Sequence, residues 1–344
     1  MPHANINNCA VVVPNWNGEE HLADCLKSLM AQSVKAHIVV VDNGSVDGSV
    51  ALIQKDFPSA ELIKLPKNTG FTGGVNAGIR QALAKNYPFI ALLNNDAAAD
   101  PDWLRMLVHH LQKHPEAGIA TSKIVSWDGH HFDSAGQCYT TWGLPFARGR
   151  GETAGEQYDT QPDVFATSGG ACLLRSSMLN QIGLFDQHFF AYYEDVDISF
   201  RAQLAGWKIH YVPSSIAKHH IGATGDSIKG FTTYQTLKNL PLLLVKNLPA
   251  RYFPLVLPRF MLAYGLFLLS ASARGQGGSA LKGVCLALWF LPSACAARWH
   301  QRRLCTVKPA YIWQLLTHSI PPGATRLQAF VEHFTNLKRT KVIS

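Results

Sequence analysis

The sequence predicts an α/β protein built on a doubly wound, mostly parallel sheet, followed by a helical C-terminal region that is apolar and basic. Short apolar runs alternate with segments of helical periodicity through the first third of the chain, which is typical of parallel sheets with helices on both faces. Polar turns follow these runs, at the places where the strands of such a sheet would end. With 344 residues, of which 47% are hydrophobic and 16% charged, the chain can form a large core.

The expected elements follow one another in a regular order. Apolar side chains recur at helical spacing between the first four apolar runs, so each run is expected to be a strand and each interval a helix. The expected strands are residues 9–13, 37–41, 62–65 and 89–93. Further along we expect a weaker strand at 118–122, loops or small strands in 129–155, a strand before Gly169 and Gly170, a helix after them, another helix ending near Gly206 and a strand to Val212.

The character of the chain changes near Pro241, where strongly apolar and basic sequence begins. We therefore expect two regions, 1–240 and 241–344, the first with halves of about 8–125 and 126–240. Seven cysteines without a CxxC pair indicate neither a zinc site nor a disulfide framework, and fit a reducing cytosol. The N-terminal stretch lacks the basic and apolar segments of a signal peptide, so export is not expected.

The C-terminal region predicts contact with an acidic surface. From Lys246 onward it holds 13 basic and one acidic side chain, a balance of +12. Its two apolar segments, 260–273 and 283–297, have 14 and 15 residues and fall short of the roughly 20 that span a bilayer. Basic flanks with Trp289 and Trp299 suit helices lying in a membrane interface; the alternative is buried helices of a small C-terminal domain. The apolar runs suit lipid better than a phosphate backbone, so no nucleic-acid partner is expected.

Four polar turns are expected at one edge of the sheet: "PNWNG" (14–18), "DNGS" (42–45), "PKNTGF" (66–71) and "NNDA" (94–97). Ordinary turn residues would explain each alone, but four together favour a shared binding site beyond the strand ends. The turns contain neither GxGxxG nor GxxxxGK[ST], which argues against a dinucleotide site and a P-loop. The acid in the fourth turn, Asp96, is either a turn residue or a metal or substrate ligand.

Five blocks in this order resemble family-2 glycosyltransferases of the GT-A fold, which are nucleotide-diphospho-sugar transferases. They are "VVVPNWNGEEHLADCLKSL", "VVVDNGSVDGS", "NTGFTGGVNAGI", "LLNNDA" and "FFAYYEDVDISFRAQLAGW". The most similar branch is the rhamnosyltransferase-like one that builds bacterial surface polysaccharides. The resemblance covers about residues 8–226.

The resemblance implies a nucleotide-sugar site at the predicted sheet edge. Asp42 would accept a hydrogen bond from the base, and a uracil or thymine imide suits that chemistry. Glycines before the third helix would allow close approach of a phosphate to the helix N-terminus. The implied nucleotide-sugar contacts are Pro14, Asn15, Asn17, Glu19, Asp42, Asn68, Gly70, Phe71, Gly73, Asn76 and Asn95.

The resemblance also implies a divalent cation, Mg²⁺ or Mn²⁺, on the diphosphate. The family's acidic motif, usually written DxD, is here Asn94-Asn95-Asp96, so this chain departs from the motif at its first position. One carboxylate with diphosphate oxygens and water can suffice for Mg²⁺. His219, with His220 as the alternative, matches a histidine that reaches the cation or diphosphate in many members; the plainer reading is a surface histidine. An imidazole ligand would favour Mn²⁺.

The catalytic base implied by the resemblance is Asp195. An inverting transfer needs a carboxylate to take the proton of the acceptor hydroxyl, and Glu194 and Asp197 would raise the pKa of Asp195 by repulsion. The alternative is a capping cluster at a helix start. Weaker acceptor contacts are expected at Glu194, Tyr193 and Trp207, with Tyr192 as a further stacking candidate, although these aromatic side chains could equally be core. Gly169 and Gly170 are expected to approach the sugar closely.

These implications predict an inverting, metal-assisted hexosyltransferase that uses a dTDP- or UDP-sugar. The branch suggests rhamnose, with galactofuranose, glucose and N-acetylhexosamine as alternatives. The acceptor would be lipid-linked or a polysaccharide, at the cytoplasmic face of the cell membrane and on its anionic surface. The competing hypothesis, which Asn94 keeps open, is a non-catalytic nucleotide-sugar-binding or scaffold protein of the same fold.

Overall fold

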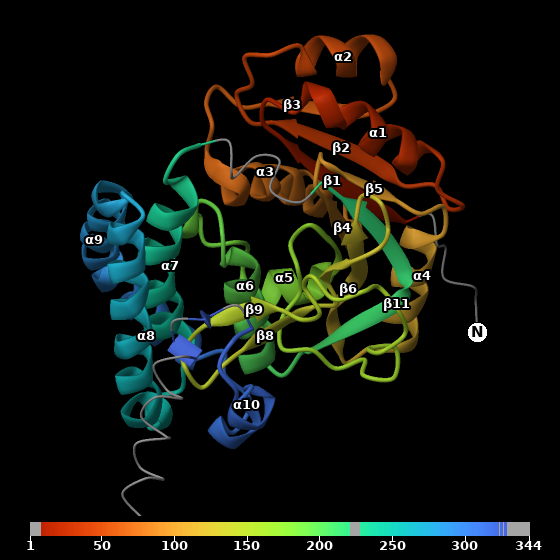
Figure 1. Cartoon of the computed structure of the whole chain (residues 1–344). Helices are drawn as coiled ribbons and strands as arrows, with labels where there is room; N and C mark the ends of the chain where they lie inside the picture. Colours follow the sequence, from red (N-terminus) through yellow and green to blue (C-terminus); the bar gives the residue numbers. More distant parts are fainter. Residues whose placement is uncertain (1–7, 221–227, 323, 326, 329–344) are drawn as a thin grey trace, which may run out of the picture.

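The structure, a computed structural model, describes residues 8–220, 228–322, 324–325 and 327–328 (Figure 1). Its first half contains four parallel strands, because each returns to the same sheet through a helix. In chain order these are β1 (Cys9–Asn15), α1 (Glu19–Met30), β2 (His37–Asp42), α2 (Ser49–Asp56), β3 (Glu61–Lys64), α3 (Gly70–Ala84) and β4 (Phe89–Leu93).

The second half extends this sheet with strands of both directions. Its elements are β5 (Ala97–Ala99), α4 (Trp103–Lys113), β6 (Ala117–Ser126), β7 (Phe132–Ser134), β10 (Ala171–Arg175), α5 (Ser176–Ile182), α6 (Glu194–Leu204) and β11 (Lys208–His219). The strand order is β3-β2-β1-β4-β10-β6-β11-β5, with β7 beside β6. A separate hairpin pairs β8 (Gln137–Tyr139) with β9 (Pro145–Ala147).

Helices cover both faces of the sheet. Helices α1, α2 and α4 pack on one face and α3, α5 and α6 on the other. Alternate side chains along the strands point to opposite faces and pack against the helices there. The predicted doubly wound, mostly parallel sheet is confirmed. One detail differs: Gly169 and Gly170 precede β10 rather than follow a strand, and β10 runs antiparallel to both β4 and β6.

The C-terminal region is helical, as expected. It contains α7 (Phe231–Asn247), α8 (Phe253–Ala273), α9 (Gly277–Arg302) and α10 (Pro309–Leu315), which form a third core with Phe165, Phe200 and Tyr139. Gly283 of α9 lies so close to α7 that a Cβ there would be 2.6 Å from the Tyr234 carbonyl oxygen. Helix α7 crosses the expected junction at 240/241, and the division into two domains stays a prediction.

The apolar segments are longer than the sequence indicated. Helices α8 and α9 have 21 and 26 residues, because Arg259, Lys282 and Arg298 lie within them and do not end them. Among the described residues, Ala250–Ala273 and Gly277–Arg302 are two stretches long and apolar enough to cross a membrane by length and composition. The prediction that these segments fall short of a bilayer is therefore wrong. Only 28% and 22% of their apolar windows are buried, unlike core helices.

Candidate active site

The carboxyl ends of β1, β2 and β4 meet at one edge of the sheet, and Asn15 joins them there. Its Oδ1 accepts a hydrogen bond from Asn95 Nδ2 at 2.8 Å, and its Nδ2 lies 3.3 Å from Asp42 Oδ1. Asp42 also accepts from the Ser45 amide at 3.2 Å. Asn15 and Asp42 are 1% and 2% exposed, so the strand-end amides and the acid form one preorganised network.

Asn17 and Glu19 shape the turn after β2. Asn17 has a left-handed φ of 49°, and its Oδ1 accepts from the Val46 amide at 2.8 Å. Glu19 Oε2 accepts from the Gly48 amide at 2.8 Å. Both side chains thus fasten the 45–48 turn to the start of α1.

Asn43, which the sequence analysis did not single out, fixes the start of α3. Its Oδ1 accepts from the Thr69 amide at 2.9 Å and its Nδ2 donates to the Gly70 carbonyl at 2.9 Å. Asn68 Oδ1 accepts from the Gly70 amide at 2.8 Å. Gly70 has a φ of +77°, which glycine adopts at no steric cost.

The remaining residues expected around α3 separate into two groups. Pro14 packs near Gly74, Gly73 leaves no room for a Cβ beside Thr69, and Phe71 lies against Gly169. Asn76 is different, because both ends of its buried amide bond the Phe185 backbone, at 2.7 and 3.0 Å. This side chain is occupied with fastening the segment after α5, so we drop it from the nucleotide contacts.

Asp96 and His219 come together, from β4 and β11, as the sequence analysis expects. His219 Nε2 lies 3.1 Å from Asp96 Oδ1, and His219 Nδ1 lies 2.9 Å from Asp133 Oδ2. Asp133, in turn, pairs with Arg150 at 2.7 Å. Burial disfavours the imidazolium, but hydrogen bonds and charge from Asp133 and Asp96 win and raise the pKa of His219 to about 9.

Asp133 was missed because it lies in the glycine-rich stretch, outside every block of the resemblance. The carboxylate on one imidazole nitrogen fixes the ring so that the other nitrogen faces Asp96. The only available sequence signal was an acid next to the apolar Phe132, at the start of a short strand.

The surroundings of Asp96 fit a divalent cation. Asn94 Oδ1 is buried and has no hydrogen-bond partner among the described residues, while Asn94 Nδ2 lies 3.5 Å from His219 Nε2. A buried acceptor without a partner, a carboxylate and an oriented imidazole are donors suited to Mn²⁺ or Mg²⁺. At the position where the family motif has a carboxylate, this chain thus has a buried amide oxygen without a hydrogen-bond partner among the described residues.

His220, the alternative to His219, makes stacking contacts with other rings. Its ring stacks on Trp127 with centroids 3.8 Å apart and on His21 with centroids 4.4 Å apart. Its amide donates to the Asp96 carbonyl at 3.0 Å, which fixes the turn that carries Asp96. Residues 221–225 of the "KHHIGATG" block lie outside the described residues.

Asp195 is held at the start of α6 by donors from three segments. Its Oδ2 accepts from the Gly169 amide at 3.0 Å and from Gln137 Nε2 at 2.9 Å, and its Oδ1 accepts from its neighbour's amide at 2.8 Å. Burial raises the pKa of Asp195, although these hydrogen bonds oppose the shift. Gln137 was missed because nothing in a short polar strand predicts a partner 58 residues away.

The two neighbouring acids differ from expectation. Asp197 is fully buried and pairs with Arg201 at 3.0 Å and Lys246 at 2.9 Å, so its charge is neutralised. Burial and then the Asp195 charge raise the pKa of Glu194 well above its usual value. The pKa of Asp195 is raised as predicted, but the main cause is burial rather than the predicted repulsion from Glu194 and Asp197.

The segment before α6 has an unusual backbone. Phe190, Tyr192 and Tyr193 have φ values of 64°, 68° and 68°, a conformation that costs energy for residues other than glycine. Asn239 of α7 holds this segment, since its Nδ2 donates to the Phe189, Ala191 and Tyr192 carbonyls at 3.0, 2.8 and 2.8 Å. The C-terminal region thus supports the backbone that presents Asp195.

Trp207 lies away from this edge. It precedes β11, whose other end carries His219, and β11 has 12 residues. Its Nε1 donates to Gln181 Oε1 of α5 at 2.7 Å, and its Cβ packs near Gly118. The structure therefore does not place Trp207 at the expected acceptor site. Tyr193, in contrast, lies next to Glu194 and Asp195 at the start of α6.

Two adjacent glycines connect the two acidic centres. The Gly169 amide bonds Asp195, and the Gly170 carbonyl accepts from the Asn94 amide at 2.9 Å. A polar strand-end network, an oriented Asp96–His219 pair and a buried acid at a helix start therefore share one end of the sheet. This arrangement is suited to an enzyme that transfers a group from a phosphorylated donor to a nucleophile.

Comparison with known proteins assigns the chain to a family. Residues 10–183 match the model "Glycosyl transferase family 2", more than half of the chain. The chain belongs to glycosyl transferase family 2.

Two relatives of known description are similar to it. The N-acetylglucosaminyl-diphospho-decaprenol L-rhamnosyltransferase of Mycobacterium tuberculosis is 30% identical over 61% of this chain and 75% of that protein. The low-salt glycan biosynthesis hexosyltransferase Agl10 of Haloferax volcanii is 25% identical over 58% of this chain and 62% of that protein. The chain thus spans less than two thirds of the second relative.

Solved structures support the GT-A fold. Residues 1–349 of S. aureus TarS in complex with UDP-GlcNAc align with a TM-score of 0.54 and 17% identity, over 86% of this chain and 89% of that one. The mannosyltransferase PcManGT of Pyrobaculum calidifontis, in complex with GDP-Man and Mn²⁺, aligns with a TM-score of 0.52 and 15% identity, over 86% and 85%. At these identities the likeness extends to the fold.

Proposed function

We propose that this family-2 enzyme is an inverting, metal-assisted glycosyltransferase that moves a sugar from a nucleoside-diphosphate sugar to a lipid-linked or polysaccharide acceptor. The donor is a dTDP- or UDP-sugar, with rhamnose as the sugar favoured by the 30% identical rhamnosyltransferase. The proposal rests chiefly on Gly169 and Gly170, which bond Asp195 and Asn94 and so bring the candidate base beside the candidate diphosphate site.

Asp195 is the proposed base. Its carboxylate takes the proton of the acceptor hydroxyl while that oxygen attacks the anomeric carbon and the nucleoside diphosphate leaves from the opposite face. A raised pKa makes this carboxylate a better proton acceptor, and bonds from Gly169 and Gln137 aim it. Tyr193 and Glu194 are proposed to face the acceptor.

The nucleotide is proposed to lie over the strand ends. Asp42 faces the base. Hydrogen bonds from Asp42 through Asn15 to Asn95 connect this side chain with the part of the site proposed to hold the diphosphate. Asn68, Gly70, Phe71 and Gly73 would lie beside the nucleotide at the start of α3. Pro14, Asn17 and Glu19 form the wall at α1.

Asp96, His219 and the Asn94 oxygen are proposed to hold Mg²⁺ or Mn²⁺. The cation would neutralise the charge that the leaving diphosphate gains. Asp133 holds the His219 ring in the orientation this requires.

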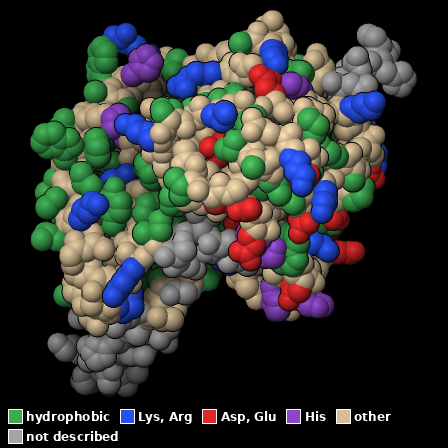
Figure 2. Space-filling view, turned by 90° about the horizontal axis from the view of Figure 1, so that it is seen from above, with side chains coloured by type: hydrophobic (Ala, Val, Ile, Leu, Met, Phe, Trp, Pro, Cys, Tyr) green, Lys and Arg blue, Asp and Glu red, His purple; other side chains and the backbone are tan. Residues whose placement is uncertain are grey.

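The region after residue 240 is proposed to bind the anionic face of the cytoplasmic membrane. We define the apolar surface as the exposed Leu255, Leu257, Met261, Leu269, Leu281, Leu288, Trp289 and Trp299 of α8 and α9. Hydrophobic side chains gather at the left of Figure 2, on the side where Figure 1 places these helices. Exposed basic side chains interleave with them, among them Arg259, Arg274 and Lys282. Such a surface suits an interfacial helix pair and would keep the enzyme near a lipid-linked acceptor.

A binding experiment tests the nucleotide and cation sites together. For the full-length protein, UDP- and dTDP-sugars with Mn²⁺ or Mg²⁺ should raise the melting temperature, because they bind only the folded state. Asp96→Ala should remove the cation-dependent part of donor binding and leave binding of the free nucleoside, which uses Asp42, unchanged. Unaltered cation dependence in Asp96→Ala would contradict the assignment. Binding without turnover in purified membranes would favour the non-catalytic alternative.

A further inference from the structure

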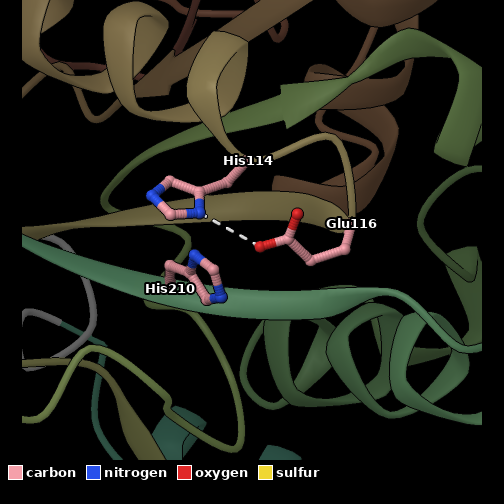
Figure 3. A group of neighbouring side chains, drawn as sticks. All are labelled: His114, Glu116 and His210. Atoms are coloured by element: carbon pink, nitrogen blue, oxygen red, sulfur yellow. Dashed lines mark hydrogen bonds and ion pairs between the residues drawn. The ribbon is translucent and has the colours of Figure 1, made fainter.

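A cluster of histidines lies at the end of the sheet opposite the candidate active site. His114 and Glu116 follow α4, and His210 is the third residue of β11, whose last residue is His219 (Figure 3). One ligand atom from each of His114, Glu116 and His210 lies within 4.8 Å of the other two. The proposed transfer uses none of these residues.

A fourth donor belongs to the same cluster. His110 Nε2 lies 2.9 Å from His210 Nδ1, and the His110 and His114 rings stack with centroids 4.4 Å apart. His110 lies in the last turn of α4 and His114 is the capping residue just after it, and the centroids of both rings lie 5.1 Å from that of the His210 ring. His110 thus lies beside His210 at the edge of the three-residue group, and the donors come from a helix, the turn after it and a strand.

Hydrogen bonds from the end of β10 hold the backbone that carries these ligands. Arg175, the last residue of β10, donates to the Leu111 and His114 carbonyls at 2.6 and 3.0 Å and to the Ala117 carbonyl at 2.9 Å. Asp163 lies 3.4 Å from His210 Nε2, a placement suited to orienting a ligating ring. The site is therefore built before any ion enters.

The distances suit a small borderline ion. Zinc binds histidine nitrogen and carboxylate oxygen at about 2.0–2.2 Å, so neighbouring donors of a tetrahedral site lie roughly 3.3 Å apart. His114 Nδ1 and Glu116 Oε1 are already 3.0 Å apart. Imidazole ligands favour Zn²⁺ over Mg²⁺ and Ca²⁺, which prefer oxygen. His114 and Glu116 are partly exposed, so an ion can reach them from solvent.

We propose that His114, Glu116 and His210, with His110 as the fourth donor, bind Zn²⁺ and clamp the end of α4 to β11. Cysteine spacing indicates no zinc site, but these ligands are histidines that only the folded sheet brings together. The ion is structural: it ties two elements that pack on the sheet and takes no part in sugar transfer.

The test uses untagged, chelator-treated full-length protein and Zn²⁺ alone. One Zn²⁺ should bind per chain and raise the melting temperature by several degrees, and Co²⁺ should give the visible absorption of a tetrahedral site. His114→Gln and Glu116→Gln, which change partly exposed side chains, should each weaken Zn²⁺ binding by about tenfold or more. His109→Gln, an exposed neighbour on α4, is the matched control and should bind like the unaltered protein.

Two results would overturn the proposal. The first is Zn²⁺ affinity unchanged in both His114→Gln and Glu116→Gln. The second is loss of the Zn²⁺ response in His219→Gln, which would place the ion at the Asp96–His219 pair instead.

Discussion

The Gly169 amide donates a hydrogen bond to the Asp195 carboxylate at 3.0 Å, and the next residue, Gly170, accepts one from Asn94. Two adjacent residues thus fix the spacing between a buried acid on α6 and the polar turn after β4. A Cβ at Gly169 would lie 3.3 Å from the Phe71 ring and 3.5 Å from Asp195 Cβ, so a side chain there would require the Phe71 ring to shift slightly. The geometry of the proposed transfer depends on this pair of peptide groups.

Asp133→Asn should weaken cation-dependent donor binding by about 10- to 100-fold, because the His219 ring loses the carboxylate that orients it. Binding of the free nucleoside should not change, since Asp42 and Asn15 are untouched. Calorimetric titration with donor and Mn²⁺ measures both. Asp128→Asn, an exposed acid between β6 and β7, is the control, and equal effects of the two variants would disprove the role of Asp133.

Asn239→Leu should lower both stability and the rate of transfer. The variant leaves three carbonyls of the left-handed segment without their donor, at a cost of about 1–3 kcal/mol. Gln235→Leu on the same helix is the matched control: Gln235 is buried and its side-chain amide has no partner among the described residues, so its loss should cost little. The measurement is the free energy of unfolding of the two variants in denaturant. Equal values would refute the supporting role assigned to Asn239.

The strand-end residues illustrate what the sequence could predict. Apolar runs followed by polar turns predicted where the parallel strands stop, and so placed Asp42, Asn15, Asn95 and Asp96 at one edge of the sheet, while their roles were implied by the resemblance. The pairing of Asp96 with His219 was also expected, from the resemblance.

Other residues depended on long-range packing. Asp133, Gln137 and Asn239 occur in polar or helical stretches where no period or motif marks them, and each reaches the site across 48 to 86 residues. Trp207 was misplaced because an aromatic residue near a motif says nothing about which end of the strand it occupies. The apolar helices were predicted to be shorter than they are, because an arginine or lysine on an exposed helix face does not end a helix.

Acid should destabilise the junction between α7 and the site. Lys246 lies 2.6 Å from Asp186 and 2.9 Å from Asp197. Burial opposes ionisation of Asp186, but the Lys246 charge and hydrogen bonds win and lower its pKa. The resulting stability is complete above the unfolded-state value near 4 and is lost as the pH falls toward and through the lower folded value.

Lys246→Met tests this junction. The variant removes the buried cation beside Asp186 and one of the two cations that pair with Asp197, and should lose about 3–5 kcal/mol at pH 7. Its melting temperature should also fall less steeply between pH 5 and pH 3 than that of the unaltered protein, as expected from the linkage. Parallel curves with the same spacing at every pH would contradict the account.

Membrane binding should depend on the apolar surface of α8 and α9. The full-length protein should float with anionic vesicles and be released only partly by high salt, since apolar burial persists when charges are screened. Replacing Leu288 and Trp289 together by Glu should release most of it, whereas Met30→Glu, an exposed apolar side chain on α1, should not. Complete recovery in the soluble fraction at low salt without detergent would contradict membrane binding.

The most direct test of the central claim is the rate of sugar transfer by Asp195→Asn, measured in a single turnover with saturating donor. The substitution keeps the shape of the side chain and can still accept a hydrogen bond from Gly169, but it removes the proton acceptor. We predict a fall of about 10²- to 10⁴-fold in the rate, with donor affinity nearly preserved. Transfer within a few-fold of the unaltered enzyme would contradict the role of Asp195 as the base, and Glu194, the neighbouring buried acid, would then take its place.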